Sequence, residues 1–157
     1  MFSKIVLALD GSEPSERAIP VLRDLVEAGS ARVDIVHVRQ LMVGRAGGLP
    51  LHADEDEITE RVRARAKDLA DAGYDVHVHV ESTVGDGPAH VIAEIAQRVG
   101  ADAILIGTRG HTPLAGLLVG SVTQRLQLIA TCPVVSVPTG GTSHVNSASD
   151  RVATTAS

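Results

Sequence analysis

One glycine-punctuated stretch carries the residues with the clearest chemical potential. Glycines stand at 107, 110, 116 and 120, and Ser121 follows the last of them just before a helical pattern that starts at Val122. Glycine lets the backbone approach a phosphate closely, and a helix start offers free N–H groups and a positive dipole end. The Ser121 hydroxyl can donate to a phosphate oxygen or contact Mg²⁺. The stretch therefore predicts a phosphate-binding loop.

Short apolar runs position this loop. Residues 103–106 form a run typical of a buried strand, and the loop leaves from its end at Gly107. A second such run, residues 5–9, ends at Asp10, Gly11 and Ser12, which is turn and helix-cap chemistry. Asp10 has two readings: it accepts a hydrogen bond from a ribose hydroxyl, as strand-end acids do in dinucleotide folds, or it only caps the first turn.

The remaining elements alternate along the chain. Further strands are predicted at 33–38, 74–80 and 134–137. Helices are predicted from Pro14 to Gly29, with a kink at Pro20, and over about 55–72, 88–100 and 122–130. Strands that alternate with helices predict an α/β fold: a single doubly wound, Rossmann-like domain with a five-stranded parallel sheet, strand order 3-2-1-4-5, and helices on both faces. Ligands in such sheets bind beyond the carboxyl ends of the strands, so Asp10 and Gly107 are expected to face one crevice.

Two segments show neither the helical nor the strand pattern of apolar residues. Residues 39–54 carry Gly44, Gly47, Gly48 and Pro50, and we interpret them as a long mobile loop. The final nineteen residues, 139–157, hold eight Ser or Thr residues and little that can pack, which predicts a disordered tail behind a domain over residues 1–138. The alternating stretch 74–80 places His77 and His79 on one strand face, typical of a strand near a sheet edge.

The composition excludes several classes of partner. A net charge of -5 argues against nucleic acid, and Phe2 and Tyr74, the only aromatic residues, cannot form a platform for unpaired bases. No apolar run approaches the roughly 20 residues of a membrane span. The single Cys132 cannot form an intramolecular disulfide, which fits a reducing compartment, and the start of the chain runs straight into a strand pattern. We therefore expect a cytoplasmic protein without a signal peptide, bound to neither nucleic acid nor membrane.

Four segments together resemble the universal stress protein family. The spacing Gly107-x-x-Gly110, nine residues, then Gly120-Ser121 is similar to that family's nucleotide-binding signature. Residues 6–12 resemble its opening strand and turn, residues 85–89 the turn after its third strand, and residues 132–138 its closing strand. The match covers about residues 3 to 138, apart from the 39–54 loop.

This resemblance implies a nucleotide site of the family's ATP-binding branch. It implies adenine and ribose contacts from Ala8, Asp10, Val38, Ile106 and Gly107, and phosphate contacts from Gly110, His111, Gly120, Ser121 and Val122. The implied ligand is ATP, with Mg²⁺. The resemblance also implies a regulatory role in stress survival, an unidentified regulatory protein partner and a homodimer formed through the last strand, here residues 133–138. Without aromatic residues at hand, the adenine must lie between aliphatic groups such as Val38 and Ile106.

Simpler readings stay open beside these. Gly107 and Gly110 can serve only to shape a tight turn, and His111 can be a solvated loop residue. His77 and His79 suggest a metal site, but no further ligands are evident. The loop lacks the Gly-Lys-Ser/Thr of a P-loop, and no water-activating base is evident near a γ-phosphate. The sequence therefore favours a nucleotide-holding regulatory module, with a slow ATP hydrolase and a nucleotide-independent interaction module as alternatives.

Overall fold

The centre of the molecule is a parallel sheet. The computed structural model describes residues 2–44, 47–50, 53–84, 87–108 and 120–138. Five parallel strands pair in the order β4-β2-β1-β5-β6. They are β1 (Lys4–Ala8), β2 (Arg32–Gly44), β4 (Asp75–Thr83), β5 (Ala103–Gly107) and β6 (Val134–Val137). Counted along the chain without the short β3, this is the predicted order 3-2-1-4-5, which is confirmed.

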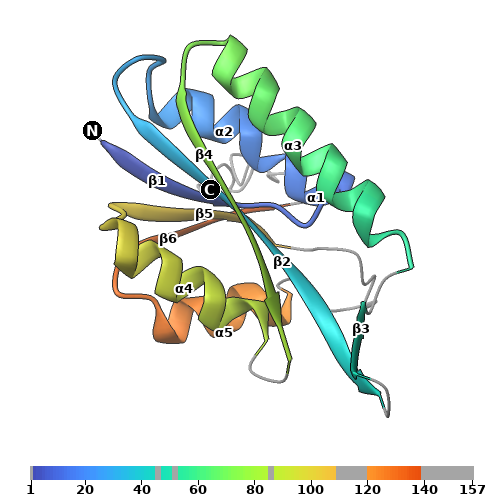
Figure 1. Ribbon diagram of the computed structural model, residues 1–157. Helices are drawn as coiled ribbons and strands as arrows, with labels where there is room; N and C mark the ends of the chain where they lie inside the picture. The colour runs from blue at the N-terminus through green and yellow to red at the C-terminus, as the bar shows by residue number, and fades with distance from the viewer. Residues whose placement is uncertain (1, 45–46, 51–52, 85–86, 109–119, 139–157) are drawn as a thin grey trace, which may run out of the picture.

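Helices cover both faces of the sheet (Figure 1). One face carries α1 (Glu13–Glu16), α2 (Ala18–Leu25) and α3 (Glu55–Asp71), and the other carries α4 (Pro88–Val99) and α5 (Ser121–Ile129). The side chains of β1 alternate between the two cores: Ile5 and Leu7 pack with α2 and α3, whereas Val6 and Ala8 pack with α4 and α5. An apolar strand of this kind is stable because water reaches neither of its faces.

The first helical segment is broken rather than kinked. Two helices, α1 and α2, meet at Arg17, three residues before Pro20. In one continuous helix the Pro20 ring would clash with the carbonyl of Glu16, and no N–H would be present to bond it. The break at Arg17 places Pro20 in the first turn of α2, where a backbone N–H has no partner inside the helix in any case.

The segment predicted as a loop over residues 39–54 is largely a β-hairpin, so that prediction is wrong for its described part. Strand β2 continues to Gly44, and β3 (Gly47–Pro50) pairs with it in antiparallel register from Leu41↔Pro50 to Gly44↔Gly47. Figure 1 shows the carboxyl-terminal part of β2 and β3 side by side, pointing away from the helices. The two strands of this ribbon are joined by antiparallel backbone pairing, which does not require apolar alternation in its glycine-rich sequence.

The outer strands and the chain ends complete the fold. Within the described ranges, β4 pairs along one side with β2 and β6 pairs along one side with β5, so the predicted edge position of residues 74–80 is confirmed. None of the described helices is both long enough and apolar enough to cross a membrane. The predicted tail, residues 139–157, and the loop residues Gly110 and His111 lie outside the described residues.

Candidate functional site

The turn after β1 forms one side of the predicted crevice. The Leu9 N–H donates to the Val36 carbonyl at 3.0 Å, which fixes the end of β1 against β2. The Asp10 carboxylate then accepts from the Ser12 N–H at 3.0 Å and from the Ser12 hydroxyl at 2.5 Å. Ser12 in turn caps α1 by accepting from the Ser15 N–H at 3.3 Å. The turn-capping reading of Asp10 is therefore confirmed, and its contact with a ribose stays a prediction.

Gly11 fits this turn closely against α3. Its φ of +73° is in the left-handed region, and a Cβ at this position would lie 2.7 Å from Ile58 Cγ2. Only glycine meets both conditions without strain. The turn that presents Asp10 is thus packed directly on the first part of α3.

The two ends of the glycine loop form the other side. The Thr108 N–H donates to the Val137 carbonyl at 2.8 Å, and the Gly120 N–H donates to the Thr108 carbonyl at 2.5 Å. The buried Thr123 hydroxyl donates to the Gly107 carbonyl at 3.0 Å. The two described ends of the loop, Thr108 after β5 and Gly120 before α5, are therefore adjacent.

The start of α5 keeps anion-binding capacity. Gly120 is its N-cap residue, and no hydrogen bond from a described side chain caps this helix. The N–H groups of Ser121 and Val122 come first in the helix and have no partner inside it, whereas the Gly120 N–H is engaged by Thr108. No acidic side chain lies in the first turn to compete with a bound anion. Ser121 is exposed and Val122 is half-buried.

Aliphatic residues predicted to contact the base share one cluster. Ala8 lies opposite Ile106 of β5 on one side and opposite Val36 of β2 on the other. Ala8 and Ile106 are buried in the core beneath α4 and α5, and Val38 and Val122 pack against the same core. The structure therefore brings four of the predicted site residues together on one face of the sheet, next to the Asp10 turn and the end of β5.

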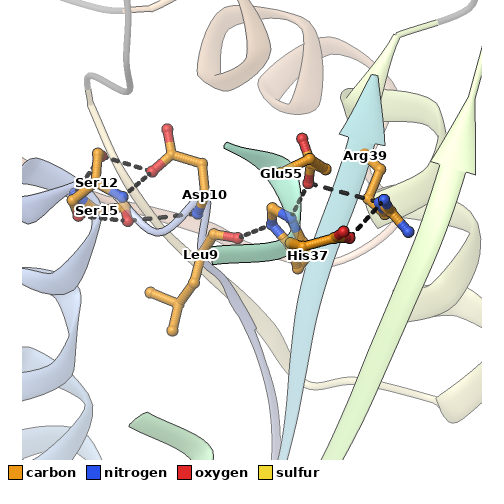
Figure 2. A network of polar contacts seen from close by, with 8 residues as sticks. Leu9, Asp10, Ser12, Ser15, His37, Arg39 and Glu55 are labelled. Carbon is orange, nitrogen blue, oxygen red and sulfur yellow. Dashed lines mark hydrogen bonds and ion pairs between the residues drawn. The ribbon is translucent and has the colours of Figure 1, made fainter. Parts of the chain in front are cut away.

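A buried polar network beside this site was missed by sequence reasoning. His37 of β2 contacts the Leu9 carbonyl through Nδ1 at 3.0 Å and Glu55 Oε1 through Nε2 at 2.7 Å. Both side chains are almost fully buried, at 3% and 4% exposure. Figure 2 shows them between the Asp10 turn and Arg39. A signal was present, because a histidine inside the apolar run 33–38 needs a buried partner.

A second polar network lies near the start of β2. The Asp34 carboxylate is fully buried and accepts two hydrogen bonds from Arg32, at 2.7 and 2.8 Å, and one from His79 at 2.8 Å. Burial opposes ionisation of Asp34, but these hydrogen bonds and the two cationic partners outweigh it and hold the pKa of Asp34 below its ordinary value. This cluster fastens the edge strand β4 to β2.

His77 and His79 have separate carboxylate partners. His79 contacts Asp34, and His77 lies 3.2 Å from Asp75. Across the part of the chain that the structure describes, no three His, Cys, Asp or Glu side chains gather closely enough to hold a metal ion.

Sequence comparison places relatives along nearly the whole chain. The model of the universal stress protein family matches residues 1–138. Universal stress protein YxiE of Bacillus subtilis is 29% identical over an alignment that covers 87% of this chain and 99% of that protein. A universal stress protein of Thermus aquaticus is 32% identical, with 87% and 99% covered.

Solved structures agree with the fold. Protein MJ0577 of Methanocaldococcus jannaschii superposes with a TM-score of 0.72 at 25% identity, covering 90% of this chain and 99% of that one. A universal stress protein in complex with cAMP has a TM-score of 0.60 at 24% identity, with 88% and 98% covered. One from Archaeoglobus fulgidus in complex with dAMP has a TM-score of 0.61 at 22% identity, with 87% and 97% covered. The last two likenesses establish the shared fold.

Proposed function

This chain belongs to the universal stress protein family, and we propose that it is an ATP-binding regulatory protein of the stress response. In this proposal ATP lies across the carboxyl ends of β1 and β5, with its phosphates at the glycine loop and the start of α5. The protein holds the nucleotide and signals its presence through contacts with a partner protein. Its place of action is the cytoplasm.

The observation that carries the proposal is the start of α5, which no described side chain caps, beside the two fixed ends of the glycine loop. Thr108 and Thr123 fix the points where the glycine loop leaves and returns. The N–H groups of Ser121 and Val122 then stand at the positive end of a nine-residue helix without an acidic neighbour in its first turn. These groups suit a phosphate, and the exposed Ser121 hydroxyl suits a phosphate oxygen or Mg²⁺. Mg²⁺ would neutralise part of the phosphate charge.

The residues for the base and the sugar also fit. Ala8 and Ile106 belong to one apolar core and the partly buried Val38 packs against it, which supports an aliphatic contact with a planar ring. Asp10 lies at the end of β1, where an acid can accept from a ribose hydroxyl. Two relatives by fold are complexes with cAMP and with dAMP, which both carry adenine. We therefore assign adenine as the base for this chain.

The side chains present support holding rather than hydrolysis. The P-loop lysine is absent, and Asp10 already binds Ser12 in the turn. We further propose a homodimer through the last strand, residues 133–138. Its support is that β6 pairs with β5 along one side and, among the described strands, with none along the other.

Thermal unfolding with and without MgATP tests the binding step. Bound ATP stabilises the folded state by mass action, so millimolar MgATP raises Tm if the Kd lies well below that concentration. Gly120→Val should abolish the shift by filling the space at the helix start. The loss of binding would be steric and not due to backbone strain, because Gly120 has φ −69° and ψ 157°, a conformation that valine adopts readily. Ser121→Ala should reduce the shift, and Ser82→Ala, at an exposed serine of β4, is the matched control.

The outcomes separate the alternatives. No Tm shift, together with no nucleotide extractable from the purified protein, overturns the proposal. Turnover of ATP that disappears in Gly120→Val and Ser121→Ala would make the protein a slow hydrolase. A protein that binds its partners equally well with and without these substitutions would be a nucleotide-independent interaction module.

A further inference from the structure

The two hydrogen-bond contacts of the His37 ring cannot both be made by a neutral imidazole beside an ionised carboxylate. Its Nδ1 lies 3.0 Å from the Leu9 carbonyl oxygen, which can only accept, so Nδ1 must carry a hydrogen. Its Nε2 lies 2.7 Å from Glu55 Oε1, and two lone pairs do not approach this closely without a proton between them. The pair therefore holds one proton more than a neutral imidazole beside a carboxylate would.

The surroundings place that proton on His37. Glu55 is the first residue of α3, where the positive helix end stabilises a carboxylate. Arg39 Nε lies 3.8 Å from the same Oε1 atom, and Arg39 Nη2 lies 3.3 Å from Asp56 Oδ1. With an imidazolium at His37, two cations face two carboxylates and the cluster is neutral. A neutral imidazole beside an ionised Glu55 would leave one uncompensated negative charge at a nearly buried site. A proton held by Glu55 instead would forgo the stabilisation that the helix end and Arg39 give to its carboxylate.

Glu55 also depends on His37 for its hydrogen bond. Arg39 Nε is buried and makes no hydrogen bond within the described residues, because 3.8 Å is too long for one. The Asp10 carboxylate accepts two hydrogen bonds from Ser12 in the adjoining turn. Among the described residues, the charged groups of this cluster are Glu55 beside His37, Arg39 beside Glu55, and Asp56 beside Arg39, with Asp10 in the adjoining turn.

We propose that His37 is a positioning residue of the nucleotide crevice and that its second proton makes nucleotide affinity depend on pH. The imidazolium ties the Leu9 carbonyl to the start of α3, and the next residue is Asp10, whose turn packs on α3 through Gly11. Loss of the proton leaves Nε2 and Oε1 as two facing acceptors, and the tie breaks. Affinity therefore falls as pH rises. This proposal rests on the proposed function.

Glu55→Gln is the variant that isolates the proton. A glutamine amide can donate to a neutral Nε2 while Nδ1–H still donates to Leu9, so the tie survives without the extra proton. Glu57→Gln is the matched control, because Glu57 is an exposed acid of the same helical turn. Glu55→Ala removes the tie at every pH.

The first measurement reads the proton in the nucleotide-free, full-length protein. Nitrogen-15 NMR of the histidine rings, with His37→Gln to assign the signal, should show hydrogens on both ring nitrogens of His37 near pH 7. Raising the pH should then move the backbone amide signals of Gly11 and Ser12 together with the His37 ring in the wild type. The same amide signals should stay fixed in Glu55→Gln. A singly protonated His37 near pH 7 would overturn the proposal.

The second measurement reads affinity. Calorimetric titration with MgATP from pH 6 to pH 9 should show the wild type and Glu57→Gln losing affinity by about fivefold or more relative to Glu55→Gln. ATP's own phosphate titrates in the same way for every protein variant, so its effect on affinity cancels when variants are compared at the same pH. Equal slopes for the wild type and Glu55→Gln would refute the positioning role. If the amide signals follow His37 but no variant binds MgATP, the proposed function fails while the tie between His37 and the turn stands.

Discussion

Replacing Gly11 by alanine tests whether the Asp10 turn is built against α3. Two costs are expected. The first is backbone strain, about 1–2 kcal/mol for an L-residue at the observed φ of +73°. The second is overpacking, since the new Cβ would lie 2.7 Å from Ile58 Cγ2 and 3.3 Å from the Ile58 carbonyl oxygen. Overpacking of a tight site costs about 1–3 kcal/mol, so the total is about 2–5 kcal/mol.

Gly100 supplies the matched control. Its φ is +65°, and a Cβ there meets no atom within 4 Å. Gly100→Ala therefore reports the backbone cost alone, about 1–2 kcal/mol. Ile58 is buried at 1% exposure, and Ile58→Ala removes the atom that collides with the new Cβ. In that background Gly11→Ala should cost less than in the wild type and come close to the cost of Gly100→Ala, because only the 3.3 Å approach to the backbone carbonyl of residue 58 remains.

Urea unfolding, followed by circular dichroism, measures each free energy of unfolding. If Gly11→Ala and Gly100→Ala lower it equally, within the extrapolation uncertainty, then the close packing of the turn on Ile58 is wrong. The same follows if Ile58→Ala leaves the excess cost of Gly11→Ala unchanged. Where binding of MgATP is detectable, Gly11→Ala should also weaken it, because a displaced turn carries Asp10 with it.

Three further substitutions or treatments have defined outcomes. Asp34→Asn should lower the free energy of unfolding by about 1–3 kcal/mol at pH 7, since it weakens hydrogen bonds to partly exposed Arg32 and His79. The pKa of Asp34 in the folded protein lies below its ordinary 3.8, so this stabilisation is present above pH 3.8 and is lost as pH falls through the folded pKa. If the urea midpoints of the wild type and Asp34→Asn differed equally at pH 7 and pH 2, this expectation would be contradicted. Thr123→Val should cost about 1–2 kcal/mol by leaving the Gly107 carbonyl without its donor, and Thr123→Ser should restore Tm. Burial, with a smaller effect of Asp102, raises the pKa of the Cys132 thiol, so iodoacetamide should alkylate it more slowly in the folded protein than in urea; equal rates would contradict this.

The sheet and most helices were predictable because their signals are local. Apolar runs such as residues 5–9 mark strands buried on both faces, and Pro88 and Gly100 mark the two ends of α4. The hairpin formed by β2 and β3 was not predictable in the same way. The paired residues, from Leu41↔Pro50 to Gly44↔Gly47, are joined through the backbone, and their sequence shows no apolar period. At Pro20 the sequence correctly indicated a disruption, but not that the chain would break at Arg17.

For the site, the sequence predicted the residues that would face a ligand but not the groups that hold them in place. Residues that a ligand would meet follow from strand ends and glycine spacing, and Ala8, Val38 and Ile106 do share one core. The groups that fix those residues in place come from distant parts of the chain. Glu55 reaches His37 from 18 residues away, and Thr123 reaches Gly107 from 16 residues away. No spacing rule connects such pairs, and only the folded arrangement identifies them.

The two sides of the crevice are fastened to different helices, and this bears on how nucleotide binding could be sensed. The Asp10 turn is tied to α3 through Gly11 and His37, whereas the loop ends are tied to α5 through Thr123. His37 and Val38 lie on β2, which continues without interruption into the hairpin with β3. A ligand that contacts Val38 therefore acts on the same strand that forms the hairpin.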